Sequence, residues 1–153
     1  MLSRKAGVTH FHVGNGKGRL HLLRQLLDEF ETPPESLYPT HVERSEKLMD
    51  EAIELTRRGC FVDIDTVNED LQKWLTYYFE HDGDPAQLTL SSDASISSPA
   101  NILSQIRECV RNSDFELAQL LPLVTENTAQ VLETERSRET RTADEGGCAG
   151  ARA

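Results

Sequence analysis

Three side chains that can bind metal ions stand at the ends of separate β-prone runs. These side chains are His12, His41 and Asp93. Imidazole and carboxylate ligands together suit Zn²⁺ or a similar first-row divalent ion. If the runs are neighbouring parallel strands, their ends meet at one edge of the sheet and the three side chains could share an ion. A single histidine at a strand end is more often structural, but recurrence at three strand ends favours a metal site.

Two further residues near these positions could hold a substrate. Arg44 follows His41 by three residues, and its guanidinium could hold a carboxylate in a two-pronged contact. A cation is unfavourable where a helix begins, which favours a functional role for Arg44 over a structural one. Ser97 could donate a hydrogen bond to a substrate or simply form a turn or cap. Asp63 and Asp65 end another β-prone run and are expected to cap the turn that follows, although they could also be ligands.

The hydrophobic pattern alternates between strands and helices along the chain. Strands are predicted at 8–13, 37–42, 60–64 and 88–92, and helices at 19–31, 45–58, 69–81, 98–111 and 114–133, the last one broken at Pro122. Pro39 should confine the second strand to a short start, and Ser98 with Pro99 should open the fourth helix. This order predicts an α/β fold of four consecutive parallel β/α units. Right-handed crossovers place all four strand ends on one edge, in an open sheet or in half of an eight-stranded barrel.

Charge and composition exclude several classes of function. The chain has 153 residues, a net charge of −10 and a pI of about 4.9, so neither a nucleic-acid surface nor an anionic membrane face is expected. Its apolar runs are too short to span a bilayer. No signal peptide is recognised, and the three cysteines form no C-x-x-C pair, which together predict a cytoplasmic protein with free thiols. Residues 1–135 are expected to form one domain, and 136–153 a disordered tail.

Three motifs in this order resemble those of isoaspartyl dipeptidases (β-aspartyl peptidases) of the amidohydrolase superfamily. They are Gly-Val-Thr-His-Phe-His-Val-Gly at 7–14, Pro-Thr-His-Val-x-Arg at 39–44 and Thr-Leu-Ser-Ser-Asp at 89–93. The resemblance covers about residues 6–132. It implies a TIM-like (β/α)₈ metal-dependent hydrolase barrel, of which this chain would form strands five to eight, the C-terminal half.

The resemblance also implies roles for individual residues. His12 and His41 would bind one Zn²⁺ of a two-metal centre. Asp93 would bind the other and act as the general base. Arg44 and Ser97 would hold the terminal carboxylate of a small peptide substrate, a dipeptide joined through the β-carboxyl of aspartate. The chain would then be a zinc dipeptidase present as a fragment.

Several family features have no counterpart in this chain. They are an early His-x-His pair, the carbamylated lysine that bridges the metals, a glutamate and a tyrosine; His10-x-His12 is not that early pair. One hypothesis is therefore an enzyme completed by a second copy or by a separate N-terminal half. Another is a non-catalytic truncated remnant with at most weak metal binding, and a third is an unrelated small β/α binding module. A half-barrel should also expose hydrophobic surface where the barrel would close.

Overall fold

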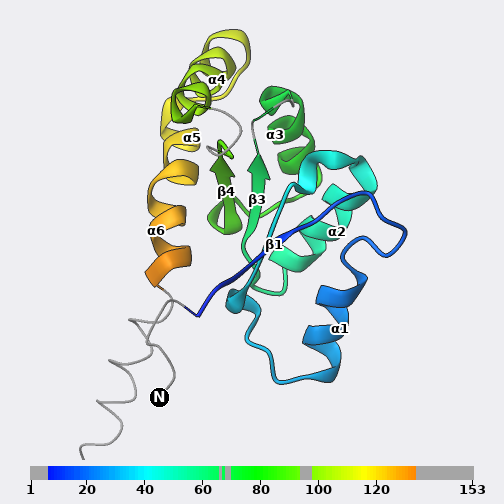
Figure 1. The fold of residues 1–153 in the computed structure, drawn as a ribbon. Coiled ribbons are helices and arrows are strands. Elements are labelled where there is room, and N and C mark those ends of the chain that lie inside the picture. Colours follow the sequence, from blue (N-terminus) through cyan, green and yellow to red (C-terminus); the bar gives the residue numbers. More distant parts are fainter. Residues whose placement is uncertain (1–6, 66, 68–69, 94–97, 134–153) are drawn as a thin grey trace, which may run out of the picture.

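A computed structural model of the chain describes residues 7–65, 67, 70–93 and 98–133. Four short strands form one parallel sheet in the order β1-β2-β3-β4. They are β1 (Thr9–His12), β2 (Leu37–Thr40), β3 (Val62–Asp65) and β4 (Leu88–Ser91) (Figure 1). The predicted α/β class and its four parallel strands are confirmed. Ser97 and the predicted tail at 136–153 lie outside the described residues.

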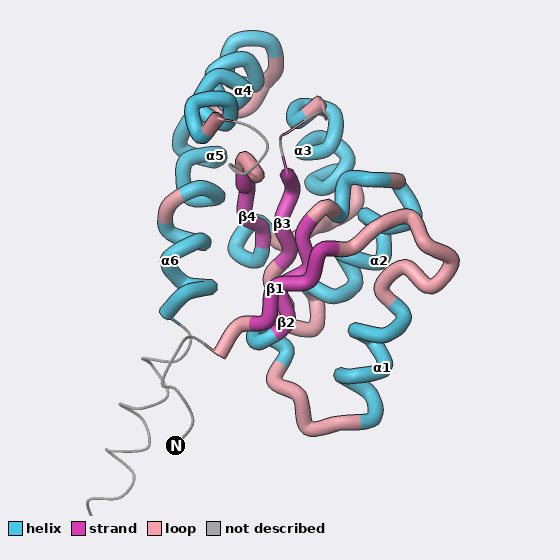
Figure 2. Tube along the Cα trace, in the orientation of Figure 1, coloured by secondary structure: helices cyan, strands magenta, loops and turns pink. Residues whose placement is uncertain are grey.

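One helix follows each of the first three strands, and three helices follow the fourth (Figure 2). They are α1 (His21–Glu29), α2 (Glu46–Thr56), α3 (Leu71–Glu80), α4 (Pro99–Asn112), α5 (Leu117–Val124) and α6 (Glu126–Glu133), with 3₁₀ turns η1 (Pro34–Ser36), η2 (Val42–Arg44) and η3 (Pro85–Gln87). The predicted cap at Ser98 is confirmed, because its hydroxyl accepts the Ala100 N–H. Ser45 and Asp70 cap α2 and α3 in the same way.

The two faces of the sheet differ completely in character. One face carries apolar side chains of β3 and β4, such as Val62, Ile64 and Leu88, which are buried in one core with residues of α2 and α3. The other face is polar. Its side chains are His10, His12, Tyr38, Thr40, Asp63, Asp65, Thr89 and Ser91. This alternation follows from the two-residue period of a strand.

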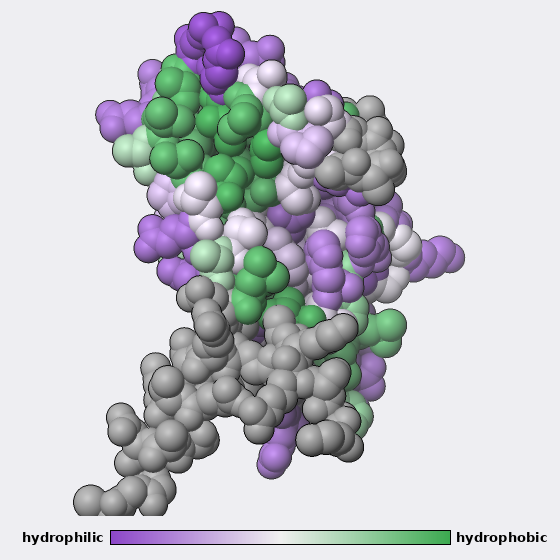
Figure 3. Space-filling view, turned by 60° about the vertical axis from the view of Figure 1, so that its left-hand side comes forward, coloured by the Kyte–Doolittle hydropathy of each residue, from purple (hydrophilic) through white to green (hydrophobic). Residues whose placement is uncertain are grey.

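Exposed large hydrophobic side chains lie on the helices and not on the sheet. Large apolar side chains are exposed on or beside α1 and on α4, α5 and α6: Leu22, Phe30, Leu103, Leu117, Leu121 and Leu132. Figure 3 shows apolar residues gathered over α4 and α5. α1 lies beside β1, and α5 and α6 contact β4; β1 and β4 are the two open edges of the sheet.

The two expectations about proline have different outcomes. The second strand is short, as expected: β2 ends at Thr40, and its pairing with β3 is limited to Thr40 opposite Asp63, although Pro39 lies inside the strand and β2 has neighbours on both sides. Helix breakage falls at Thr125 and not at Pro122, which lies inside α5. The Thr125 hydroxyl donates to the Leu121 carbonyl, and the Thr125 N–H donates to the Pro122 carbonyl. Thr125, the residue that follows α5, therefore ends this helix through its own hydrogen bonds.

Across the described ranges, every helix is too short or too polar to cross a membrane.

Candidate metal centre

His12 and His41 meet at the carboxyl edge of the sheet. The register places His12 opposite Thr40, so His41 is the first residue beyond β2. His12 Nδ1 lies 2.8 Å from His41 Nε2. Two nitrogens bound to one tetrahedral zinc at ordinary bond lengths are about 3.3 Å apart. If the two rings moved apart by a few tenths of an ångström, one ion could therefore replace the hydrogen between the two nitrogens.

The backbone of His41 is held in an unusual conformation. Its φ of 65° and ψ of 34° lie in the left-handed region, which non-glycine residues adopt only when the surroundings require it. Asp93, two residues beyond β4, has a φ of 40°. Only two other non-glycine residues in the described part of the chain have positive φ, Arg19 and Asp82. Two residues predicted as ligands thus share this feature.

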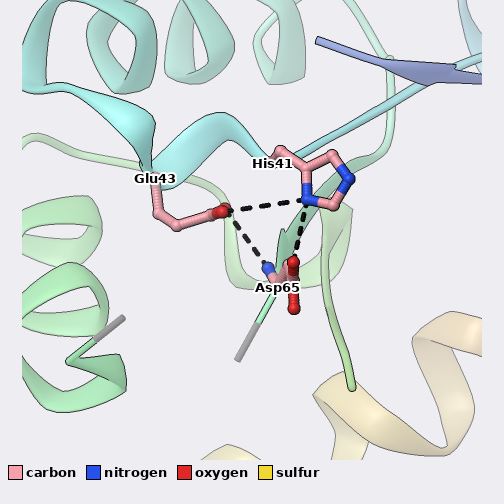
Figure 4. A group of neighbouring side chains, drawn as sticks. All are labelled: His41, Glu43 and Asp65. Atoms are coloured by element: carbon pink, nitrogen blue, oxygen red, sulfur yellow. Dashed lines mark hydrogen bonds and ion pairs between the residues drawn. The ribbon is translucent and has the colours of Figure 1, made fainter. Parts of the chain in front are cut away.

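The second ring nitrogen of His41 faces two carboxylates (Figure 4). His41 Nδ1 lies 2.9 Å from Asp65 Oδ2 and 4.0 Å from Glu43 Oε1. Nδ1 is buried, and its contact with Asp65 is not aligned well enough to be a regular hydrogen bond. One potential ligand atom from each of the three side chains lies within 4.8 Å of the others. This group has a geometry that could hold a metal ion.

Backbone donors fix the two carboxylates in place. The Val67 N–H donates to Asp65 Oδ1 at 2.8 Å, and the Asp65 N–H donates to Glu43 Oε2 at 3.2 Å. Glu43 is 1% exposed. Burial raises the pKa of Glu43 to about 7, and the neighbouring carboxylates of Asp65 and Asp63 act in the same direction. Asp65 therefore caps the turn after β3, as expected, and also contacts His41.

Asp63 does not cap a turn, contrary to expectation, because it lies within the sheet. It is fully buried and accepts hydrogen bonds from four hydroxyl groups. Thr40 and Ser91 donate to Oδ2, both at 2.6 Å, and Thr89 and Tyr38 donate to Oδ1 at 2.8 and 3.3 Å. Burial raises the pKa of Asp63 while the hydroxyls oppose the rise. This carboxylate links β2, β3 and β4 beneath the edge that carries His41.

The remaining predicted site residues lie around the same edge. Asp93 is half-buried and follows β4, which β3 separates from β2. Arg44 is exposed in η2, and its carbonyl accepts a hydrogen bond from the Asn15 side chain at 2.8 Å, which ties together the loops after β1 and β2. Its guanidinium forms no ion pair with any residue that the structure describes. The structure thus brings His12 and His41 into contact and places Asp93 and Arg44 on the same side of the sheet.

Sequence reasoning missed Glu43 and underestimated Asp65. In the motif Pro-Thr-His-Val-x-Arg, Glu43 occupies the position treated as variable, yet it is buried against His41. One signal was available: Asp63 and Asp65 alternate with apolar residues in a strand whose neighbours are buried, which places both acids on the polar face. Nothing in the sequence pattern indicated the contact between Glu43 and Asp65.

A parallel β/α sheet with paired histidines and carboxylates at its carboxyl edge is the arrangement of many metal-dependent enzymes. No family model matches the sequence. The structure is similar to β-aspartyl dipeptidase from the thermophilic, keratin-degrading Fervidobacterium islandicum AW-1. One structure of that enzyme matches with a TM-score of 0.76 and 30% identity over 86% of this chain and 37% of its own. Another, in complex with a β-Asp-Leu dipeptide, matches with a TM-score of 0.76 and 28% identity over 86% of this chain and 40% of its own.

These structures confirm the resemblance to β-aspartyl dipeptidases drawn from the sequence motifs. The chain spans about two fifths of the length of the enzyme that it resembles. The four parallel strands match part of that enzyme's fold.

Proposed function

We propose that this chain is part of a zinc-dependent hydrolase that cleaves β-aspartyl dipeptides, and that it forms the C-terminal half of a (β/α)₈ barrel. The observation that carries the proposal is the pair of nitrogens, His12 Nδ1 and His41 Nε2, 2.8 Å apart at the sheet edge. The similar enzyme of known structure was solved with a β-Asp-Leu dipeptide. The carboxyl edge of a β/α sheet is also where such folds bind substrates.

The residues of this chain fit a metal-dependent hydrolysis. His12 and His41 would hold one Zn²⁺, and Asp93 would bind a second. Bound zinc supplies a lowered pKa for water and a polarised scissile carbonyl. The Asp93 carboxylate would accept the proton of the attacking water and pass it to the leaving amine. The Arg44 guanidinium, exposed at the same edge, would hold the terminal carboxylate of the dipeptide, together with Ser97.

A two-metal site requires more ligands than His12, His41 and Asp93. The proposal therefore includes a complementing β/α half, either a second copy or another segment, that supplies the other ligands. The surface supports this arrangement, since exposed apolar side chains flank both open edges of the sheet. Phe30 and Leu22 lie on the α1 side, and Leu117 and Leu121 lie on α5, which contacts β4.

A second candidate is a non-catalytic chain that binds one metal weakly. It is favoured by the small number of metal ligands that this chain contributes at the edge. On this hypothesis the His12 and His41 pair would still bind zinc, but no β-aspartyl dipeptide would be hydrolysed under any condition.

The proposal can be tested by measuring bound metal and turnover together. The 153-residue chain is loaded with Zn²⁺ and assayed with β-Asp-Leu, with α-Asp-Leu as the control substrate. The assay is run alone and after mixing with the complementary segment of the Fervidobacterium enzyme. We expect hydrolysis of the β-linked peptide only, and its loss in His41→Ala. Zinc binding without turnover in either assay would support the non-catalytic alternative, and no zinc binding at any Zn²⁺ concentration would contradict both.

A further inference from the structure

A line of three side chains runs from β1 to β3 through the candidate metal centre. His12 Nδ1 faces His41 Nε2 at 2.8 Å, and His41 Nδ1 faces Asp65 Oδ2 at 2.9 Å. His41 therefore uses both ring nitrogens, each toward a different strand. A neutral imidazole has one N–H and one bare nitrogen, so only one of these two contacts can use a His41 proton.

The contact with Asp65 decides which nitrogen carries that proton. A bare ring nitrogen and a carboxylate oxygen repel each other at 2.9 Å, so a proton on Nδ1 or a cation beside it is favoured, even though the contact is bent away from a regular hydrogen bond. Asp65 Oδ1 is already occupied by the Val67 N–H, which leaves Oδ2 for His41. The other carboxylate, Glu43, lies 4.0 Å from the same nitrogen. Glu43 is too far from Nδ1 for two ligands of one tetrahedral zinc, which lie roughly 3.3 Å apart. Glu43 is also buried and held in place by the Asp65 N–H. Nδ1 is buried as well, so a proton is the better occupant.

We propose that Asp65 is a positioning residue that holds neutral His41 as its Nδ1–H tautomer, so that the Nε2 lone pair points at His12 Nδ1. A carboxylate behind a metal-binding histidine commonly fixes its tautomer and ring orientation in this way. The left-handed backbone of His41 delivers the ring to this position. The consequence for zinc binding rests on the proposed function, but the tautomer itself does not.

The proposal also specifies what happens to His12. Without metal, His12 Nδ1–H donates to the bare Nε2 of His41. When an ion takes the place of that hydrogen, the proton leaves Nδ1 and a proton is gained at Nε2 of the same exposed ring, so the neutral ring only changes tautomer. His41 needs no change. His41 thus keeps one tautomer with and without metal, and only His12 changes tautomer when metal binds.

Asp65→Asn is the informative variant because the hydrogen bond in the turn fixes the orientation of the side-chain amide. The Val67 N–H requires an oxygen at the Oδ1 position, so the amide NH₂ takes the Oδ2 position and donates toward His41 Nδ1. That interaction favours the Nε2–H tautomer, as when asparagine replaces the aspartate of a catalytic triad. Glu43→Gln is the matched control, since a neutral side chain of the same shape can still accept the Asp65 N–H.

The test is ¹⁵N NMR of the histidine rings in the metal-free, full-length chain at pH 8, where ordinary histidines are neutral. We expect His41 as Nδ1–H in wild type and in Glu43→Gln, and as Nε2–H in Asp65→Asn. An Nε2–H tautomer in wild type overturns the proposal, even if Asp65→Asn fails to fold. An unchanged tautomer in folded Asp65→Asn also overturns it.

Zinc affinity, measured by competition with a chromophoric chelator, gives a second readout that needs no enzymatic activity. We expect Asp65→Asn to weaken binding about 10- to 100-fold, His12→Ala to weaken it further, and Glu43→Gln to change it little. If Glu43→Gln and Asp65→Asn both bind zinc much more weakly and His12→Ala binds it as tightly as wild type, the ion lies at His41 Nδ1 and the proposal is overturned. If His41 is the Nδ1–H tautomer in wild type but no β-aspartyl dipeptide is hydrolysed even after complementation, the proposed function is contradicted and the tautomer proposal stands.

Discussion

The Nδ1 atom of His12 lies 2.8 Å from the Nε2 atom of His41, although the two residues are 29 positions apart in the sequence. Parallel pairing of β1 with β2 creates this contact, because it brings the ends of both strands to the same level. The approach of two nitrogens from adjacent strands is the geometric basis for the predictions that follow.

Removing either histidine of the pair should abolish tight zinc binding. His12→Ala and His41→Ala should each weaken Zn²⁺ binding by more than about 100-fold, since loss of a direct ligand exceeds the cost of losing an outer partner. His21→Ala is the matched control, because His21 is exposed at the start of α1. Isothermal titration with Zn²⁺ measures the effect. Equal affinity in all three variants would rule out a site at this pair.

Removing the Asp63 carboxylate should strongly destabilise the fold. Asp63→Ala removes the acceptor of four hydroxyl groups, of which those of Thr40 and Thr89 are buried, and we expect a loss of about 3–5 kcal/mol in the free energy of unfolding. Asp50→Ala is the control, because Asp50 is exposed and accepts one hydrogen bond from Tyr77. It should cost less than about 1 kcal/mol. Urea unfolding followed by circular dichroism measures both, and similar values would contradict the role of Asp63 in joining three strands.

The buried Cys60 thiol should make stability depend on alkaline pH. Burial raises the pKa of Cys60 from 9.0 to about 11. The unfolded chain ionises this thiol first, so its contribution to stability is complete below pH 9 and is lost as the pH rises toward 11. Between pH 8 and pH 10 wild type should therefore lose about 1 kcal/mol more than Cys60→Ala. Urea unfolding of both proteins at the two pH values measures this difference. If wild type and Cys60→Ala lose the same free energy of unfolding between pH 8 and pH 10, Cys60 does not titrate as described.

Arg44 should contribute to substrate binding through the terminal carboxylate of the dipeptide. In a complemented, active enzyme, Arg44→Ala should raise the KM for β-Asp-Leu about 10- to 100-fold, with a smaller effect on kcat. The exposed Lys47, three residues along the chain, offers the control Lys47→Ala, which should leave KM unchanged. A dipeptide amidated at its C-terminus should bind wild type and Arg44→Ala equally. If the variant still discriminates between acid and amide, another residue holds the carboxylate.

The order of elements and their type could be predicted from the sequence. Leucine spacing and capping residues such as Ser98 define the helices through local contacts, and short β-prone runs between helices of this length require parallel crossovers. The alignment of His12 with His41 follows from the same logic, because parallel strands bring their carboxyl ends to one edge. The exact position of a break was less predictable: the last helical segment is interrupted at Thr125, whereas Pro122 is accommodated inside α5.

Only the tertiary structure determined which side chains contact one another at the carboxyl edge of the sheet. The left-handed conformation of His41, the burial of Glu43 and the contact between His41 and Asp65 depend on the packing of η2 against the end of β3. Likewise, Asp63 gathers hydroxyls from β2 and β4, which are distant in sequence. Motif spacing gave the residue types that can bind a metal. Strand register and burial determined which nitrogen faces which partner, because hydrogen-bond direction depends on distances of a few tenths of an ångström that no sequence pattern encodes.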